Sequence, residues 1–212
     1  MARVGILGGT FNPPHVGHLI CAQDALDQLG LDRVVLMPVH TPPHKEALLD
    51  PGGEVRLRLC ELATEGEEGL SASRLELDRP GPSWTVDTLR ALHATCPGDE
   101  LTFIVGGDQA QGLPTWREPE AILDLATLAV AERAGVRRED VRSRLSGLAG
   151  AERVRFFDMP RIDISSSDIR RRVAARRPIR HLVPRAVATY IGEQGLYLLP
   201  AGATLEQGDP GA

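Results

Sequence analysis

Two histidines beside a glycine turn are the residues of this chain whose types and spacing most favour chemistry. Gly8 and Gly9 follow an apolar β-branched run, and His15 and His18 open the next apolar-periodic segment. Glycine lets main-chain N–H groups approach a ligand closely, and the positive end of a helix dipole favours an anion at the same place. Histidines three residues apart share one face of a helix. The stretch therefore predicts a phosphate-binding turn with two imidazoles beside it.

The residues around this turn narrow the phosphate chemistry. A P-loop needs Gly-Lys-Ser/Thr, which the turn lacks, and a dinucleotide fingerprint needs Gly-x-Gly-x-x-Gly with an acid near the end of the second strand. Here the glycines are Gly5, Gly8 and Gly9, and the second strand ends Leu-Met-Pro-Val at residues 36–39. Imidazoles aimed at phosphate instead favour nucleotidyl transfer, in which negative charge builds on the α-phosphate and on departing pyrophosphate.

A second candidate phosphate site is the run Ile-Ser-Ser-Ser-Asp-Ile-Arg at residues 164–170. Serines at a helix start either cap free backbone N–H groups or leave those groups and their own hydroxyls to hold phosphate oxygens. Arg170, one turn into the helix, adds a planar bidentate donor. The alternative is a simple capping motif, with Ser165 and Asp168 spaced like a capping box and residues 170–172 forming a solvated cationic face.

The run Gly-Gly-Thr-Phe-Asn-Pro-Pro-His-Val-Gly-His at residues 8–18 resembles the nucleotidylyltransferase superfamily, most closely the bacterial nicotinate-nucleotide adenylyltransferases. Residues 164–170 resemble that superfamily's second signature, Ile-Ser-Ser-Thr-x-Ile-Arg, with Ser167 where threonine is usual. One departure is Asn12, where the family mostly has aspartate. Further stretches resemble segments typical of this family and occur in the same order as in the family: residues 41–45, 81–89, 106–108, 113–116 and 190–197. The resemblance therefore covers nearly the whole chain.

This resemblance implies adenylyl transfer from ATP to nicotinate mononucleotide by direct in-line displacement, giving nicotinate adenine dinucleotide and pyrophosphate, a step of NAD biosynthesis. The implied catalytic residues are His15 and His18, which would contact the α and β phosphates. The implied ATP-binding residues are Gly8, Gly9, Thr10, Phe11, Gly106, Asp108, Ser166, Ser167 and Arg170. The implied mononucleotide-binding residues are His44, Lys45, Thr85, Trp116 and Arg133.

Several of these implied roles have a simpler alternative. Trp116 would stack on the pyridine ring and Thr85 would contact the ring's carboxylate, but a loop tryptophan is otherwise a partly buried anchor. Asp108 is otherwise an ordinary turn aspartate, and Arg133 is followed by alanine where the family usually has proline. Asn12 lacks a negative charge, so we expect Mg²⁺ on the phosphate oxygens of ATP and predict no metal ligand in the protein.

The elements that position these residues alternate between strand and helix, which predicts an α/β, Rossmann-like doubly wound parallel sheet with helices on both faces and a C-terminal helical subregion. The expected strands are residues 4–7, 33–39, 70–77, 101–105, 127–131 and 154–157. The expected helices are residues 15–29, 50–65, 85–94, 121–125 and 138–148, with short helices from Ser166 and Pro184. Asp50 and Pro51 are expected to cap and start the second of these helices.

Composition indicates one domain over residues 1–200 with a disordered tail at 201–212. The chain has 212 residues, 42% of them hydrophobic, and a net charge of −5, which weighs against a nucleic-acid surface. Three widely spaced cysteines without Cys-x-x-Cys predict neither a disulfide framework nor a zinc ribbon. No apolar run approaches the roughly 20 residues of a membrane span, and a signal-peptide layout is lacking. We therefore expect a cytoplasmic enzyme, and a homo-oligomer is left open.

Other functions remain open from the sequence alone. Another adenylyltransferase of the superfamily could use nicotinamide mononucleotide or pantetheine phosphate, although the pantetheine-phosphate family is usually shorter and has threonine where His15 stands. Class I aminoacyl-tRNA synthetases share the histidine motif, but this chain has no room for a tRNA-binding domain. From different classes, the chain could be a non-catalytic nucleotide sensor, or could bind a metal through His15, His18, His40 and His44.

Overall fold

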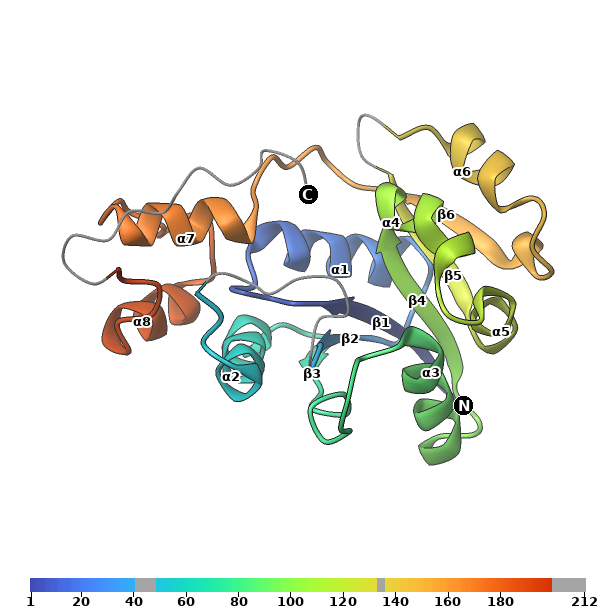
Figure 1. Ribbon diagram of the computed structural model, residues 1–212, viewed down its shortest axis with the longest axis horizontal. Helices are drawn as coiled ribbons and strands as arrows, with labels where there is room; N and C mark the ends of the chain where they lie inside the picture. Colours follow the sequence, from blue (N-terminus) through green and yellow to red (C-terminus); the bar gives the residue numbers. More distant parts are fainter. Residues whose placement is uncertain (41–48, 133–135, 200–212) are drawn as a thin grey trace.

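The computed structural model describes residues 1–40, 49–132 and 136–199. These residues form a six-stranded sheet in the order β3-β2-β1-β4-β5-β6, and each neighbouring pair of strands is parallel (Figure 1). The strands are β1 (Arg3–Gly9), β2 (Arg33–Pro38), β3 (Leu70–Ala72), β4 (Glu100–Gly106), β5 (Thr127–Glu132) and β6 (Val154–Asp158). The expected parallel sheet is confirmed.

Helices cover both faces of this sheet. They are α1 (Val16–Gln28), α2 (Gly53–Thr64), α3 (Thr85–Thr95), α4 (Gly107–Gly112), α5 (Pro119–Leu125), α6 (Arg138–Leu145), α7 (Ser166–Ala174) and α8 (Arg185–Glu193), with 3₁₀ turns at Leu113–Thr115 and Ala151–Arg153. Successive strand residues point to opposite faces. Ile104 accordingly belongs to a core on one face, together with Ala25 of α1 and Cys60 of α2. Its neighbour Phe103 belongs to a core on the other face, together with Leu89 of α3 and with buried residues of α5 and α6. The doubly wound arrangement is therefore confirmed.

A third core forms the expected C-terminal helical subregion. Ile169 of α7 and Val187 of α8 are fully buried, and they pack with Leu59 of α2 and with Tyr197 beyond α8. In Figure 1 this subregion lies beside the end of α1 that carries the histidines. The C-terminal segment is thus part of the same packed structure as the sheet.

The strand order reverses at β1, which lies between β2 and β4. Ligands of such sheets bind in the crevice outside the carboxyl ends of the strands at this switch point. The register pairs Leu7 of β1 with Ile104 of β4, so the segments that follow Gly9 and Gly106 leave the sheet at neighbouring positions on one edge. Gly8 and Gly9 were expected in a turn, but they are the last two residues of β1 and pair with Met37 and Pro38 of β2, so the turn begins at Thr10. This strand end and the Gly106–Asp108 stretch therefore border the crevice.

Several expected element boundaries are wrong, and two of them have a clear local reason. The strand expected at residues 70–77 ends at Ala72, because β3 is an edge strand and the chain then turns, with the N–H groups of Leu77 and Asp78 donating to the Arg74 carbonyl. Helix α2 begins at Gly53 rather than at Asp50, because the Asp50 carboxylate accepts the Gly52 N–H at 3.0 Å and forms a turn ahead of the helix.

Helix α6 ends at Leu145, three residues before its expected end, since the N–H of Leu148 turns back to the Leu145 carbonyl. Helix α4 had no sequence signal, because six residues are too few to show an apolar period. The expected tail at 201–212 lies outside the described residues. Within the described part of the chain, no helix has the length and apolar character needed to cross a membrane.

Candidate active site

The two histidines of the first motif stack on each other at the start of α1. His15 is the residue that precedes the helix, and its backbone N–H donates to Nδ1 of His18 at 3.1 Å. The ring centroids are 3.7 Å apart with 26° between the ring planes. Because Nδ1 of His18 accepts, a neutral His18 ring carries its proton on Nε2. The expected shared face is confirmed.

Packing fixes the position of this imidazole pair. A Cβ atom at Gly17 would lie 3.1 Å from the His15 ring, so a side chain at this position would push against the histidine. The Phe11 ring is buried and meets the His18 ring edge-on, with 5.0 Å between centroids. His15 itself is only 8% exposed. The two rings are therefore held in one arrangement before any ligand arrives.

The second motif docks onto the first. The Ser166 hydroxyl donates to the Pro13 carbonyl at 2.8 Å, and Nη1 of Arg170 donates to the Asn12 carbonyl at 2.7 Å. The other arm of Arg170 donates to the Ser167 hydroxyl at 3.1 Å. Burial of the Arg170 guanidinium lowers its pKa from the usual value. The start of α7 is thus fastened to the loop between the glycine turn and the histidines.

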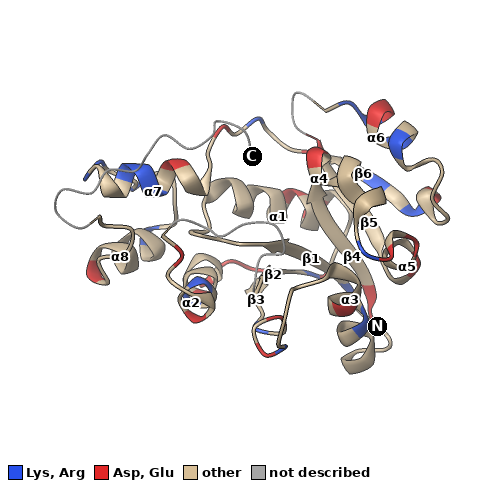
Figure 2. Ribbon diagram, in the orientation of Figure 1, with Lys and Arg blue, Asp and Glu red and all other residues tan. Residues whose placement is uncertain are grey.

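The capping alternative also holds for part of this motif. The Ser165 hydroxyl accepts the Asp168 N–H at 3.1 Å and caps α7. Arg171 and Arg172 lie within 3.6 and 3.1 Å of the Asp168 carboxylate. Figure 2 shows that basic residues are concentrated on α7. Ser165 and the two later arginines are therefore structural, whereas Ser166 and Arg170 join the two motifs.

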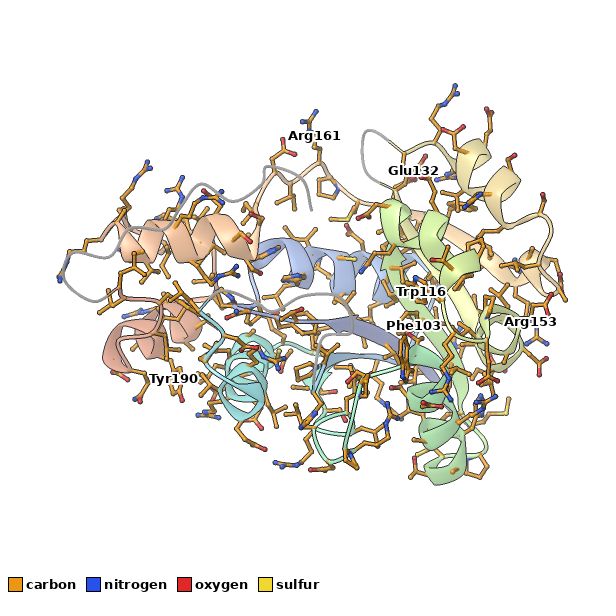
Figure 3. All side chains as sticks on the ribbon, in the orientation of Figure 1. Phe103, Trp116, Glu132, Arg153, Arg161 and Tyr190 are labelled. Atoms are coloured by element: carbon orange, nitrogen blue, oxygen red, sulfur yellow. The ribbon has the colours of Figure 1, made fainter. Side chains whose placement is uncertain are left out.

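A cavity of about 480 Å³ opens beside the glycine turn. It has the size of ordinary small-ligand sites. Five of the expected site residues line it: Gly8, Gly9, Thr10, Thr85 and Trp116. Trp116 packs edge-on against Phe103 of β4, with 6.2 Å between centroids and 81° between planes (Figure 3). The first motif and the aromatic landmark, far apart in the sequence, therefore share one cavity.

Other expected site residues lie elsewhere. Gly106 precedes α4 and is buried, and Asp108 is exposed in the first turn of that helix. Neither residue lines the cavity, although both follow β4 at the switch point. His44, Lys45 and Arg133 lie outside the described residues, so their predicted roles stay predictions.

Arg56, which no sequence pattern singles out, holds two segments that border the site. It comes from α2, and its side chain is 1% exposed. Its guanidinium donates to the carbonyls of Thr10 (3.1 Å), Val39 (2.7 Å) and His40 (3.1 Å) and to the Asp50 carboxylate (3.0 Å). Arg56 therefore ties the segment after β1 to the segment after β2. One feature of the sequence hints at its burial: Arg56 lies four residues before Cys60, so both residues lie on the same, buried face of α2.

A buried carboxyl group forms another missed part of the cavity wall. Glu76 is 6% exposed and accepts the Thr88 hydroxyl at 2.6 Å. Burial raises the pKa of Glu76, and hydrogen bonds from Thr88 and Ser83 oppose this effect. The Ser83 hydroxyl also accepts the His40 N–H at 2.9 Å. Glu76, Ser83 and His40 thus connect the start of α3 with the end of β2.

Arg117, directly after Trp116, also lines the cavity and was likewise missed. An arginine in a polar loop carries no sequence signal of its own, because most such arginines are solvated.

As for metals, the described residues contain no cluster of three or more His, Cys, Asp or Glu side chains. The four-histidine alternative depends on His44, which lies outside them.

The sheet order, with its switch point at β1, defines a Rossmann-like α/β protein, a class in which ligands bind at that point. Comparison with known proteins then gives the family. A family model described as cytidylyltransferase-like matches residues 6–172. Two curated relatives, from Symbiobacterium thermophilum and Thermus thermophilus, are named "Probable nicotinate-nucleotide adenylyltransferase". The first is 42% identical over 93% of this chain and 96% of its own length, and the second 43% identical over 92% and 99%. The chain therefore belongs to the cytidylyltransferase-like family, and within it to the nicotinate-nucleotide adenylyltransferases.

A solved structure supports the fold independently. The Plasmodium falciparum nicotinic acid mononucleotide adenylyltransferase complexed with NaAD superposes with a TM-score of 0.74, covering 93% of this chain and 98% of that one. Its sequence identity is 17%, so the likeness concerns the fold. The expected Rossmann-like nucleotidyltransferase fold is confirmed.

Proposed function

We propose that this chain transfers the adenylyl group of ATP to nicotinate mononucleotide in NAD biosynthesis, forming nicotinate adenine dinucleotide and pyrophosphate. The observation that carries the proposal is the continuity of the cavity with the phosphate turn. Gly9, the last residue of β1, and Thr10, the first residue after it, both line the cavity, and the loop that starts at Thr10 leads to His15 and His18. A mononucleotide in the cavity would present its 5′-phosphate beside the imidazoles. The names of the curated relatives support the same activity.

The reaction is a direct displacement at phosphorus. An oxygen of the mononucleotide's 5′-phosphate bonds to the α-phosphorus of ATP, and the bond from that phosphorus to the α–β bridging oxygen breaks. Pyrophosphate leaves with the bonding electron pair. A phosphate is an adequate nucleophile at neutral pH, so the protein contributes positioning and charge stabilisation. In this proposal Nε2–H of His18 donates to the α-phosphate, and His15 contacts the departing phosphates.

Both motifs bind ATP in this proposal. The backbone from Gly8 to Phe11 holds the reacting phosphates, while Gly106 and Asp108, after β4, lie near the nucleoside. Ser166, Ser167 and Arg170 hold the β and γ phosphates. Ser166 and Arg170 also fasten α7 to the loop before the histidines, so they act through position as well as through contact. Arg170 retains donors beyond the two hydrogen bonds it makes within the described structure.

The mononucleotide occupies the cavity with its ring against Trp116. The backbone N–H of Thr85 then meets the ring's carboxylate, because Thr85 is the first residue of α3 and no side chain caps this helix. Carboxylate binding at a helix start is favoured by the dipole. We keep His44, Lys45 and Arg133 as proposed phosphate contacts on the strength of the sequence.

Mg²⁺ enters, in this proposal, on the phosphate oxygens of ATP. The groups around the turn are backbone N–H donors, imidazoles and a guanidinium, which suit phosphate rather than a metal ion. Asn12, 1% exposed in the same loop, supplies an amide and no charge. We further propose that the enzyme works in the cytoplasm on these two small substrates, with its oligomeric state left open.

A substrate panel tests the proposal. Pyrophosphate release with Mg-ATP is measured for nicotinate mononucleotide, nicotinamide mononucleotide and phosphopantetheine. A buried donor that faces the wrong group costs on the order of 1–3 kcal/mol, and loss of the charged acceptor adds to this. We therefore expect kcat/KM to favour the acid mononucleotide over the amide by at least about a hundredfold. Equal use of both would remove the acid preference, and no release with any acceptor would refute adenylyl transfer.

A further inference from the structure

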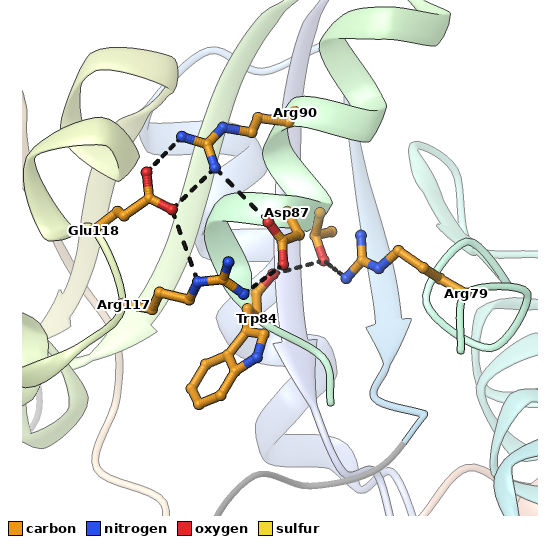
Figure 4. A network of polar contacts seen from close by, with 7 residues as sticks. Arg79, Trp84, Asp87, Arg90, Arg117 and Glu118 are labelled. Atoms are coloured by element: carbon orange, nitrogen blue, oxygen red, sulfur yellow. Dashed lines mark hydrogen bonds and ion pairs between the residues drawn. The ribbon is translucent and has the colours of Figure 1, made fainter. Parts of the chain in front are cut away.

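Arg117 sits at the edge of the cavity. It forms a network of ion pairs with three other charged side chains, those of Asp87, Arg90 and Glu118 (Figure 4). Its Nη1 donates to the Asp87 carboxylate at 3.1 Å, and its Nε lies 3.8 Å from Glu118. Arg90 joins the same network through Glu118, at 2.6 and 3.1 Å, and through Asp87, at 3.8 Å. Of these four residues, Arg117 alone lines the cavity. A cluster with no net formal charge therefore turns its positive group toward the ligand space.

The Arg117 guanidinium lies at the start of α3. Its central carbon is 5.9 Å from the centroid of the Trp84 ring, and Trp84 is the residue that precedes the helix. Asp87, which holds the guanidinium, is the third residue of the same helix. Thr85 lies between Trp84 and Asp87 in the sequence and also lines the cavity. Its N–H is the group proposed to meet the ring's carboxylate. A positive side chain is thus placed beside the point where the carboxylate would bind.

Holding the loop in place does not account for the orientation of Arg117. Arg90 already joins the loop to α3, because both of its terminal nitrogens donate to Glu118. Nη2 of Arg117 makes no hydrogen bond to any residue that the structure describes. The side chain is half exposed at the cavity, so that Nη2 can reach an incoming anion while Nη1 stays on Asp87.

We propose that Arg117 is a specificity-determining residue, whose guanidinium pairs with the carboxylate of the acid mononucleotide and thereby favours it over the uncharged amide. The inference rests on the proposed function, because it needs the pyridine ring in this cavity. Guanidinium–carboxylate hydrogen bonds are charge-assisted and stronger than those to a neutral carboxamide. The pairing therefore changes the preference between two substrates that share every other group.

The test compares variants on both mononucleotides. For Arg117→Gln we expect the ratio of kcat/KM for the acid to that for the amide to fall at least about tenfold. Arg117→Lys keeps the charge, but one ammonium cannot contact Asp87 and the ligand carboxylate as the two ends of a guanidinium do, so its ratio should lie between those of wild type and Arg117→Gln. Arg90→Gln removes a charge from the same network without touching the cavity, and should leave the ratio within about twofold of wild type. Equilibrium binding of each mononucleotide without ATP should show the same order.

Two results would overturn the inference. One is an unchanged ratio in Arg117→Gln, and the other is an equal fall in Arg90→Gln, which would mean that the network only holds the loop. The wild-type measurements report separately on the proposed function. If the wild-type enzyme forms no dinucleotide from either mononucleotide, the function and this inference fall together. If it uses both and the Arg117→Gln ratio is unchanged, only the inference falls. Thermal melts confirm that each variant is folded.

Discussion

Replacing Arg56 by methionine is the most informative single perturbation of this structure. The change keeps a long flexible apolar side chain in place of the buried stem and removes the guanidinium. Four hydrogen bonds are lost at once, three of them to main-chain carbonyls at the ends of β1 and β2. We expect the protein to lose both stability and activity, because the Thr10 carbonyl belongs to the segment that connects β1 with the two histidines.

The size of the effect follows from the groups that remain. Removing one partner of a buried ion pair costs about 3–5 kcal/mol, and the 27% exposure of the Asp50 side chain favours the lower end. Each carbonyl left without a donor adds about 1 kcal/mol unless water reaches it. The sum, roughly 4–6 kcal/mol, is a large part of the 5–15 kcal/mol typical of a folded domain. At about 2–4 °C per kcal/mol for a chain of this size, Tm should fall by roughly 8–24 °C.

Urea denaturation and thermal melts measure this loss, and Arg58→Met is the matched control. Arg58 lies on the same helix, is half exposed, and pairs with Glu61 at 3.1 Å, so its removal should cost no more than about 0.5 kcal/mol. Arg56→Lys should fall between the two, since an ammonium keeps the charge but cannot span the same carbonyls. A loss below about 1 kcal/mol for Arg56→Met, or one equal to that of the control, would refute this reasoning.

Three further predictions concern the site itself. His18→Ala should lower turnover by about 10²-fold with the fold intact, because a donor to the developing phosphate charge is worth about 3 kcal/mol; steady-state kinetics within threefold of wild type would contradict this. Arg170→Lys should weaken ATP use by about tenfold and also lower Tm, since one ammonium cannot bridge Asn12 and Ser167; a lower Tm with unchanged ATP kinetics would make the residue purely structural. Glu76 has a raised pKa in the folded state, so its contribution to stability is present below its unfolded pKa and is lost as pH rises through the folded one. The Tm of Glu76→Gln relative to wild type should therefore rise between pH 4 and pH 8, and a constant difference would count against a raised pKa.

The sequence predicts those parts of the site that depend on local patterns. The strand and the helix within residues 3–28 follow from apolar spacing, although the strand runs on through Gly8 and Gly9, which were expected in a turn. The shared face of His15 and His18 follows from helix geometry. The switch point follows from the alternation of strands and helices, which admits few topologies. For these features, the residues that decide the structure are neighbours in the chain.

What the sequence does not predict depends on contacts between distant segments. Arg56 becomes a site residue only because α2 brings it against two strand ends, and no pattern within α2 names those partners. Ser166 and Arg170 were expected to serve phosphates directly, yet each also binds a carbonyl of the first motif. The cavity wall at Glu76 and Arg117 forms through side chains that helix and strand periods leave unspecified.

Because α7 docks on the first motif, the arrangement of the site depends on residues near both ends of the chain. The two hydrogen bonds from Ser166 and Arg170 join residues 153 and 158 positions apart. During synthesis the glycine turn and both histidines emerge early, yet their loop lacks these two restraints until the last quarter of the chain has been made and packed. Nascent or C-terminally damaged molecules can thus contain these glycines and histidines without the contacts that hold their loop. We therefore expect full activity only in molecules whose C-terminal segment has folded into place.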